Sequence, residues 1–488
     1  MQNLITHLIK KTSAKVYSVG RGFSQTLNND LPNDGKELVV SWIFEQELKE
    51  IASHLGEIIP TPPEKGLFLY QEKNKELDIV LVRFPQIDGK FSAFIPIEDD
   101  LKNKLLTIDA VAFDERAEKI VNPYSGFEHI LNRELHILNA GMLKKEPTSL
   151  IDIAIIASCG FELTSAAKDI ISANKNQLKL ATNRAIGYKL SSLMRIDYPK
   201  IAFDLLSELD LLRYVFPRLY AAQKVKQTRK AGVLDVASHI LLCVNKVNKK
   251  NEMIRWAALY HDLGKTATKK MIDGKLRFFG HEKVSAKWAY KDLMDYGFSQ
   301  PFAADVSHLV LHHMFDGGPQ LTDEGVRRLI HRVGPKYIFD LLELRLADSA
   351  GFIGTPTGTW KITKLRERIN TELSKNPFSA IGLDITSEDI KKIVSIDDSK
   401  LIEKIQELLL VLVLFNNIKN TKTDLIGLLT SLDFAKLKTF CPLQLHWLLD
   451  QQISRIENRA DENTDGTLKC GKYCSYKCDN NSEALWQL

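Results

Sequence analysis

The hydrophobic pattern of this chain changes near Ser149, and this change limits the folds that the chain can adopt. Before it, four short β-branched runs bounded by Gly, Asp, Asn or Lys predict strands: KVYSVG, KELVVSWIF, LDIVLVRF and TIDAVAFD. Between two of these runs, EQELKEIASHLG is amphipathic and predicts a helix that ends at Gly56. After Ser149, apolar residues recur with helical spacing almost throughout. We therefore expect an α+β protein, with a small antiparallel or mixed sheet in an α/β head and helices after it.

Length and composition indicate a soluble protein of several domains. A chain of 488 residues exceeds one compact unit, so two to four domains are expected. The net charge of +5 permits contact with nucleic acid but does not require it. The six cysteines are too unevenly spaced for a disulfide framework, which favours a reducing compartment. The N-terminus has no signal-peptide core and no apolar run spans a membrane, so we expect a cytoplasmic protein; its oligomeric state is open.

A charged pair, His261-Asp262, ends a helical segment that otherwise suits a protein core, NEMIRWAALYHDLGK. Its apolar residues share one face with His261, and Gly264 suits the position just past a helix end. An ionised Asp262 beside an apolar face is costly unless something positive compensates it. A buried, hydrogen-bonded histidine and an Asp262–Lys265 pair are the two ordinary explanations, because His-Asp alone is a weak motif.

More histidines and a second acid stand in order around this pair. They are His239 in LDVASHILLCV, His281 in FFGHEKVSA, His308, His312 and His313 in HLVLHHMFDGG, and Asp348 in LLELRLADSAG. His239 and Asp348 fall on the inner faces of apolar helices, and His281 starts a helix. A whole ordered set of this kind predicts metal binding, although each histidine alone is more often structural.

The residue types suit divalent metals such as Mn, Fe, Co, Ni, Zn or Mg. The ligands predicted for one ion are His239, His261, Asp262 and Asp348. Those predicted for a second ion are His281, either His312 or His313, and Asp262 as a bridge. Two adjacent metal ions activate a water and steady the leaving oxygen in phosphoester hydrolysis.

The order His, His-Asp, His, His, Asp resembles that of the HD phosphohydrolase superfamily, with HDLGK, GHE and a His-His pair before Asp-Gly carrying the likeness. Segments 326–351 and 384–429 resemble those that follow the HD motif in bacterial CCA-adding tRNA nucleotidyltransferases and their poly(A) polymerase relatives. In front, VYSVGRGFSQTL, KELVVS, LDIVLVR, IEDDLKNKLLTIDAVAFD and IVNPYSGFEH match further blocks of that family in order. The resemblance covers about residues 14–430.

The resemblance also implies a division of the chain and roles for its residues. The expected parts are a degenerate nucleotidyltransferase-like head (1–140), a helical neck (141–222), an HD metal-dependent phosphohydrolase domain (223–352), a helical tail (353–430) and a C-terminal extension (431–488). Asp262 and Lys265 are the expected catalytic residues. Lys265, Arg327 and Arg328 are the expected contacts to a substrate phosphate.

The head departs from the family pattern where nucleotide transfer needs acids. The family places two acids one residue apart on a strand, and here the corresponding residues are Gly35, Lys36 and Glu37. The second glycine of its phosphate turn is Arg21. No arginine occurs from 134 to 183, where the family reads the incoming base. We expect an eroded transferase site in which Glu37 and Asp78 retain at most weak metal binding.

These observations give one leading expectation and two alternatives. The first is an HD phosphodiesterase or phosphatase acting on nucleotides or RNA ends, such as 2′,3′-cyclic ends and 2′-nucleotides, with the tRNA 3′ end as natural substrate. The second is an active tRNA nucleotidyltransferase of the CCA or poly(A) type. The third is a non-catalytic protein that binds RNA or nucleotides. Basic clusters in QKVKQTRKAG and NKVNKKNEMIR give RNA binding modest support.

The C-terminal extension lies outside the resemblance. Its segment LKCGKYCSYKCDN spaces Cys470, Cys474 and Cys478 four residues apart, which would align three thiols on a helix. Zinc or an iron–sulfur cluster is one interpretation, and a polar tail that happens to hold three cysteines is the other.

Overall fold

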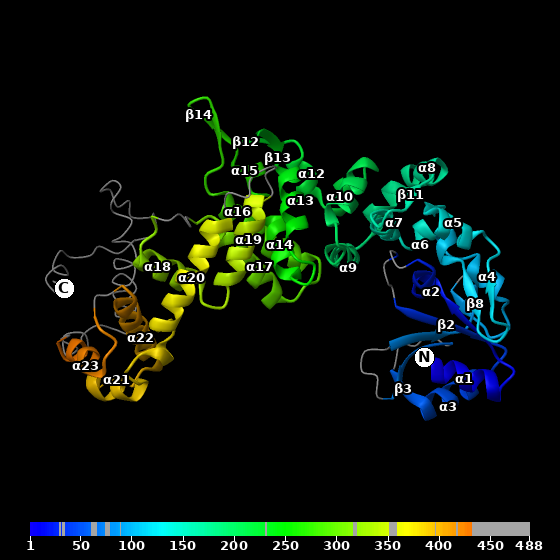
Figure 1. Cartoon of the computed structure of the whole chain (residues 1–488), viewed down its shortest axis with the longest axis horizontal. Helices are drawn as coiled ribbons and strands as arrows, with labels where there is room; N and C mark the ends of the chain where they lie inside the picture. Colours follow the sequence, from blue (N-terminus) through cyan, green and yellow to red (C-terminus); the bar gives the residue numbers. More distant parts are fainter. Residues whose placement is uncertain are drawn as a thin grey trace. The chain divides into compact units, whose positions relative to one another are not determined.

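The structure is a computed structural model that describes residues 1–28, 31, 35–59, 66–73, 79–87, 89–229, 232–315, 320–350, 359–395, 397–415 and 418–431. The chain divides into two compact units (Figure 1). The first is drawn from Met1–Asp316 and Phe339–Ile362, and the second from Gly317–Ile338 and Thr363–Leu488. The α+β class predicted from the sequence is confirmed, with a sheet in the head and helices after it.

The head contains a seven-stranded mixed sheet in the order β3-β4-β5-β2-β1-β8-β9. The strands are β1 (Lys15–Val19), β2 (Lys36–Ser41), β3 (Gly56–Ile59), β4 (Leu67–Glu72), β5 (Ile79–Arg83), β8 (Ala112–Asp114) and β9 (Lys119–Val121). Only β2 and β5 pair in parallel among them. Each of the four predicted runs contains one strand, although in the fourth a 3₁₀ turn, Thr107–Asp109, precedes β8.

The two faces of the sheet are covered separately because side chains alternate along each strand. On one face Val16 and Val40 pack with residues of α1 (Gln2–Lys11) and α3 (Glu45–Leu55). On the other face Tyr17 and Val39 pack with residues of α4 (Ile97–Leu101). Helix α3 ends at Gly56 as predicted. A Cβ at Gly56 would lie 2.2 Å from the Gln71 carbonyl oxygen, so the close approach of β4 requires glycine there.

Helices form most of the rest of the first unit. They are α2 (Gly20–Leu27), α5 (Gly126–Asn132), α6 (Met142–Lys145), α7 (Ser149–Ala157), α8 (Ser165–Asn174), α9 (Asn183–Met194), α10 (Pro199–Glu208), α11 (Leu212–Val215), α12 (Pro217–Ala222), α13 (Val236–Lys246), α14 (Glu252–Tyr260), α15 (Lys265–Thr268), α16 (His281–Asp295), α17 (Gln300–His312) and α19 (Ile338–Ala350). Side chains of Thr164, Thr182, Asp235 and Ser299 cap four of them.

Short strands occur between the helices, and apart from them the expectation of helix almost throughout after Ser149 is confirmed. The pairs are β10 (Glu134–Leu135) with β11 (Glu162–Leu163), β12 (Lys226–Arg229) with β13 (Gly232–Asp235), and β14 (Lys270–Ile272) with β15 (Lys275–Arg277). The last pair turns at Asp273 and Gly274, both with positive φ. An Asp-Gly turn of this kind is a hairpin signal that the helical interpretation overlooked.

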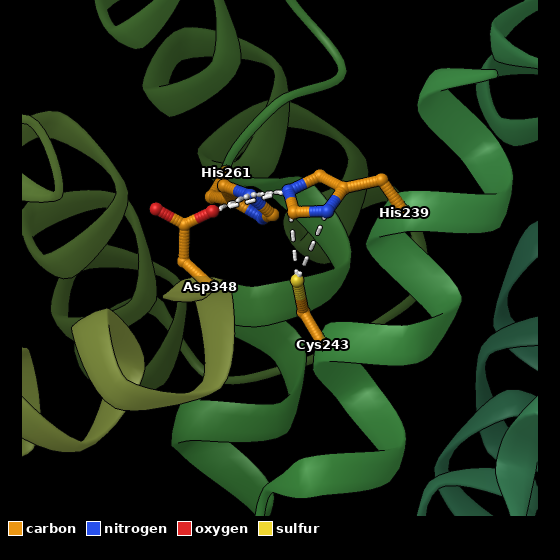
Figure 2. Close-up of side chains that lie close together, drawn as sticks. All are labelled: His239, Cys243, His261 and Asp348. Carbon is orange, nitrogen blue, oxygen red and sulfur yellow. Dashed lines mark hydrogen bonds and ion pairs between the residues drawn. The ribbon is translucent and has the colours of Figure 1, made fainter. Parts of the chain in front are cut away.

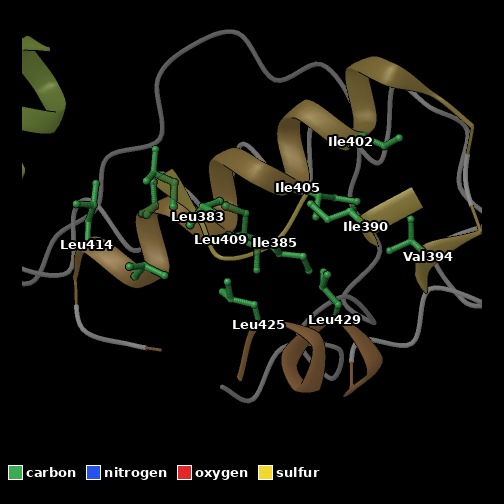
Figure 3. Packing of buried hydrophobic residues seen from close by; sticks show 14 of the residues in the cluster. Leu383, Ile385, Ile390, Val394, Ile402, Ile405, Leu409, Leu414, Leu425 and Leu429 are labelled. Carbon is green, nitrogen blue, oxygen red and sulfur yellow. The ribbon is translucent and has the colours of Figure 1, made fainter. Parts of the chain in front are cut away.

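The second unit has its own apolar core (Figure 3). Its helices are α18 (Asp323–Val333), α20 (Thr359–Lys375), α21 (Ser387–Val394), α22 (Ser399–Leu414) and α23 (Lys422–Ser431). In that core Leu409 of α22 is fully buried, together with Ile390 of α21 and Leu425 of α23. Among the described residues, no helix combines the length and apolarity that crossing a membrane requires.

Candidate metal centre

Five helices of the first unit carry the predicted ligands to one place. His239 lies on α13, the pair His261-Asp262 follows α14, His281 begins α16, His313 follows α17 and Asp348 lies near the end of α19. All six side chains are buried. Helix α14 packs against α13, α16 and α17, so the ends of helices far apart in the sequence converge.

The turn after α14 is shaped by Gly264. Gly264 lies past the end of α14, as expected, with a φ of −60°, and it directly precedes α15. Its backbone lies against the start of α16, where an added Cβ would be 2.2 Å from the His281 carbonyl oxygen. The Gly264 N–H donates to Ser285 Oγ at 2.8 Å. The glycine therefore permits the close approach that brings Asp262 beside His281.

The first ligand group contains His239, His261 and Asp348 (Figure 2). The two Nε2 atoms are 3.3 Å apart, and His239 Nε2 lies 3.1 Å from Asp348 Oδ1. His261 Nε2 lies 3.8 Å from the same oxygen. The thiol of Cys243, one turn after His239 on α13, completes the group.

The second ligand group contains Asp262, His281 and His313. Asp262 Oδ1 lies 3.2 Å from His281 Nε2 and 3.8 Å from His313 Nε2, and these two nitrogens are 3.3 Å apart. The other oxygen, Asp262 Oδ2, lies 3.5 Å from His239 Nε2 and 3.4 Å from His261 Nε2. One carboxylate therefore faces both groups, as a bridging ligand must.

Three of the imidazoles are oriented in the same way. Nδ1 of His261, His281 and His313 donates to the carbonyl oxygen three residues earlier, at 2.7, 2.8 and 2.7 Å. Because a carbonyl can only accept, Nδ1 carries the proton and the Nε2 of each neutral ring presents a lone pair to the centre. Backbone bonds of this kind typically fix metal-binding histidines.

The charges in the centre favour deprotonated ligands. Burial would raise the pKa of Asp262, but in the absence of a metal His261, when it carries a second proton, and Lys265 outweigh it and hold that pKa well below its usual range. At Asp348, burial again acts to raise the pKa, but the hydrogen bond with His239 outweighs it, so the pKa of Asp348 is also lowered. Burial lowers the pKa of His313 and so favours the neutral ring. Ionised carboxylates and neutral imidazoles are the forms that bind a metal.

Lys265 is part of this centre. Its Nζ lies 2.5 Å from Asp262 Oδ2 and 2.8 Å from Gln227 Oε1, and its side chain is buried. The two ordinary explanations of the His261-Asp262 pair therefore both hold: the histidine is hydrogen-bonded and the acid is paired. They coexist with a donor set that fits a divalent metal, because the other oxygen, Asp262 Oδ1, faces the Nε2 atoms of His281 and His313.

The remaining predicted residues lie elsewhere. The choice left open between His312 and His313 falls on His313, since the His312 ring packs on His308 with centroids 4.6 Å apart. In the second unit, Arg327 is buried and bonded to Glu372 at 2.9 Å, and Arg328 binds Glu324 at 2.7 Å. Substrate contact by these arginines stays a prediction. Cys470, Cys474 and Cys478 lie outside the described residues.

The head contains a separate pocket beside β2. A cavity of 290 Å³ is lined by residues of the turn and strand that resemble the family's phosphate turn and acid strand, including Gly20, Arg21, Lys36 and Glu37. Glu37 Oε1 lies 2.5 Å from Arg83 Nε and its Oε2 lies 3.6 Å from Lys104 Nζ. Burial acts to raise the pKa of Glu37, but Lys104 and Arg83 outweigh it and lower that pKa to about 2. Asp78, the other acid expected here, lies outside the described residues.

Two groups of potential ligands were missed from the sequence. Cys243 follows His239 by four residues, a spacing that places both on one helical face. On the head, His129, Glu134 and His136 also converge, with the two rings stacked at 3.8 Å between centroids. Their spacing in the chain carries no recognisable pattern, and only the fold brings them together.

Comparison with known proteins shows which proteins this chain is similar to. Residues 232–345 match the family described as HD domain. The Multifunctional CCA protein of Mannheimia succiniciproducens is 25% identical over 374 residues, covering 70% of this chain and 85% of that protein. The Bacillus stearothermophilus CCA-adding enzyme in complex with CTP shares the fold with a TM-score of 0.65 at 17% identity, covering 90% of this chain and 98% of the other.

A further solved structure, the Thermotoga maritima CCA-adding enzyme complexed with tRNA, has a TM-score of 0.50 at 13% identity and covers 88% of this chain and 93% of the other. The sequence likeness extends well beyond the HD segment, and the fold likeness runs through most of the chain. The match to the HD domain covers residues 232–345, and the sequence and fold of this chain are similar to those of CCA-adding enzymes.

Proposed function

We propose that this chain acts on tRNA 3′ ends or related nucleotides, and that its HD centre hydrolyses their phosphoesters. One observation carries the proposal: the buried carboxylate of Asp262 faces two groups of ligands, one with each oxygen. A pair of divalent metals in such a centre would polarise the phosphoryl oxygens and supply an activated water. The residues proposed to hold them are His239, His261, Asp348, His281 and His313, with Asp262 between the two.

The protein's own groups have three tasks in this reaction. The backbone carbonyls that accept from Nδ1 hold the imidazoles in place, so that little reorganisation accompanies binding. Lys265 balances the charge of Asp262 and stands ready to meet a substrate phosphate as a point charge. Water adds to phosphorus, one P–O bond breaks, and the leaving ribose oxygen takes up a proton. Opening a 2′,3′-cyclic end in this way leaves a phosphomonoester.

We take the proposed substrate class from the names of the similar proteins. One of the solved structures of similar fold is a CCA-adding enzyme complexed with tRNA, and another is complexed with CTP. A cytoplasmic location, where tRNA is processed, fits the sparse cysteines of the sequence. RNA is therefore the proposed partner, and phosphate contacts would make its binding sensitive to salt.

Nucleotidyl transfer in the head is the second candidate, and the named relatives favour it over hydrolysis. The pocket beside β2 keeps Gly20 and Glu37 in place. The acids of that pocket argue against nucleotidyl transfer. The reaction uses carboxylates that hold two metal ions against the triphosphate. Glu37 is the only acid of the Gly35-Lys36-Glu37 stretch, and it is paired with Arg83 and Lys104.

Two assays on the same metal-loaded preparation separate the candidates. Hydrolysis of 2′,3′-cyclic AMP is expected, with no incorporation of labelled CTP or ATP into tRNA that lacks its terminus. Incorporation without hydrolysis would overturn the leading proposal in favour of the second. If neither occurs with any of Mn, Fe, Co, Ni, Zn or Mg, the chain is a binding protein and both candidates fail.

A further inference from the structure

A buried glutamine outside the predicted ligand set lies beside Lys265. Gln227 belongs to β12, whose hairpin partner β13 runs directly into α13, the helix that carries His239. Side chains alternate along a strand, so Lys226 is exposed while Gln227 is only 4% exposed. Gln227 Oε1 accepts a hydrogen bond from Lys265 Nζ at 2.8 Å, and the same ammonium lies 2.5 Å from Asp262 Oδ2. The hairpin therefore places an amide next to the HD centre.

The contact with Lys265 fixes the orientation of this amide. An ammonium only donates, so the amide atom of Gln227 that faces Lys265 is the oxygen, and the nitrogen points elsewhere. That nitrogen, Nε2, is buried and has no hydrogen-bond acceptor among the residues that the structure describes. A buried amide nitrogen without an acceptor lowers stability, and native proteins rarely keep one unless water or a ligand completes it. The N–H groups of Gln227 therefore point to a bound acceptor.

The position of this nitrogen suits the phosphate of a substrate. Because the two amide atoms of Gln227 share one carbon, Nε2 also lies close to Lys265 Nζ. An ammonium has three N–H donors, and the bonds to Asp262 and Gln227 use two of them, which among the described residues leaves one for a phosphate oxygen. A phosphate carries three strong acceptor oxygens, so it can accept from both nitrogens at once.

We propose that Gln227 and Lys265 hold the substrate phosphate together: Gln227 Oε1 orients the ammonium, and Gln227 Nε2 donates to a phosphoryl oxygen. The inference rests on the proposed hydrolysis at the HD centre and deepens it, because it assigns a second group that recognises the phosphate. The amide is neutral, so it adds a directed donor without changing the charge balance between Lys265 and Asp262. Gln227 supplies no metal ligand, so Asp262 and the reacting water keep their places.

The competing explanation is that Gln227 only holds Lys265 in place and that a buried water completes its amide. A residue with that task acts on phosphate entirely through Lys265, so its removal has no effect once Lys265 is gone. A direct donor still contributes in the absence of Lys265. A double-mutant cycle on the affinity for phosphate therefore separates the two explanations without any measurement of turnover.

The experiment titrates the Mn²⁺-loaded full chain with inorganic phosphate in a calorimeter. Gln227→Met keeps the length of the side chain but removes the amide, and it should weaken phosphate binding by about tenfold or more, because hydrogen bonds to charged groups are among the strongest. It should leave Mn²⁺ binding nearly unchanged. Gln227→Met should also weaken phosphate binding in a Lys265→Met background. The matched control Gln223→Met should change neither affinity, since Gln223 Nε2 donates to Ser207 Oγ at 2.7 Å, away from the ligand groups.

Unchanged phosphate affinity in Gln227→Met would overturn the inference, and so would the lack of any further loss in the Lys265→Met background. Should Gln227→Met fail to fold, Gln227→Glu decides the question, because it keeps an oxygen for Lys265 and replaces the donating nitrogen. Phosphate binding as tight in Gln227→Glu as in the unmodified protein would refute the donor. Any of these refutations, with Mn²⁺ binding and hydrolysis of 2′,3′-cyclic AMP intact, leaves the proposed function standing. Absence of both metal binding and hydrolysis in the unmodified protein would refute the proposed function and the inference together.

Discussion

The HD centre holds a buried acid and the head pocket a half-buried one, both with a lowered pKa, but the acids are compensated differently. Burial opposes ionisation at Glu37 and at Asp262 alike. Lys104 and Arg83 overcome it at Glu37. At Asp262, His261 is the largest compensating influence and Lys265 the next. A lowered pKa therefore does not distinguish a metal ligand from a structural ion pair; the type of partner does.

The difference has a chemical consequence. An imidazole can lose its proton and bind the same metal as the acid beside it, whereas a guanidinium never can. Arg83 also binds Asp100 through two nitrogens, at 2.7 and 2.9 Å, so a metal at Glu37 would have to disrupt a buried network. In the HD centre, a metal at Asp262 Oδ2 would have to displace the contact with Lys265.

The largest expected effect tests the HD half of this comparison. Replacing Asp262 with Asn keeps its shape but removes the charge shared by both ligand groups. Hydrolysis of 2′,3′-cyclic AMP should fall by about 1,000-fold, because a bound metal supplies several kcal/mol of transition-state stabilisation. The control Asp204→Asn, on the surface of α10, should leave the rate within a factor of about two. Full activity in Asp262→Asn would show that hydrolysis, if present, occurs elsewhere.

The second-largest expected effect concerns the ion-pair network of the head. Arg83→Met leaves the buried carboxylate of Asp100 without its guanidinium partner, and breaking such a pair costs about 3–5 kcal/mol. Chemical denaturation followed by the signal of the head should show this loss in the free energy of unfolding. Arg195→Met, which removes an ion pair with a largely exposed arginine, should cost less than about 1 kcal/mol. Equal, small losses in both variants would mean that the head network is not structural.

A smaller effect sharpens the ligand assignment. His313→Ala removes an Nε2 that faces Asp262, whereas His312→Ala removes a ring that packs on His308. Isothermal titration with Mn²⁺ should show affinity lowered about 10- to 100-fold in the first variant and nearly unchanged in the second. The reverse result would assign the second group to His312.

The smallest expected effect is a pH dependence of the stability of the head. The pKa of Glu37 is lowered from 4.5 to about 2 in the folded protein, so its ionised form stabilises the fold. This contribution is complete above pH 4.5 and is lost as the pH falls through about 2. Denaturation at stepped pH should therefore show a steeper loss of head stability in that window for the unmodified protein than for Glu37→Gln. Parallel curves would contradict the pairing of Glu37.

The sequence predicted which segments form the HD centre, but not every side chain in it. Helical spacing placed His239 and Asp348 on inner faces, and the motif order grouped them with His261. It could not choose between His312 and His313, because adjacent residues point about 100° apart and the packing of α17 decides which one enters the site. Cys243 stood at the correct spacing, but a cysteine among apolar residues is ordinarily read as core.

The head could be predicted only in outline. Its strands followed from β-branched runs, and the single acid of Gly35-Lys36-Glu37 was visible in the sequence. The partners of Glu37 were not visible, because Arg83 lies 46 positions away and reaches it only through the parallel pairing of β2 and β5. Long-range pairing of this kind is fixed by the fold, and no local pattern encodes it.

One reaction tests the central claim most directly. A tRNA that lacks its CCA terminus and ends in a 2′,3′-cyclic phosphate is incubated with the metal-loaded protein, CTP and ATP, beside the same tRNA with a free 3′ hydroxyl. We predict that the cyclic end is opened and that neither tRNA is extended. Extension of the tRNA with the free hydroxyl, with the cyclic end intact, would show that the head is the active centre and that the HD ligands serve another purpose.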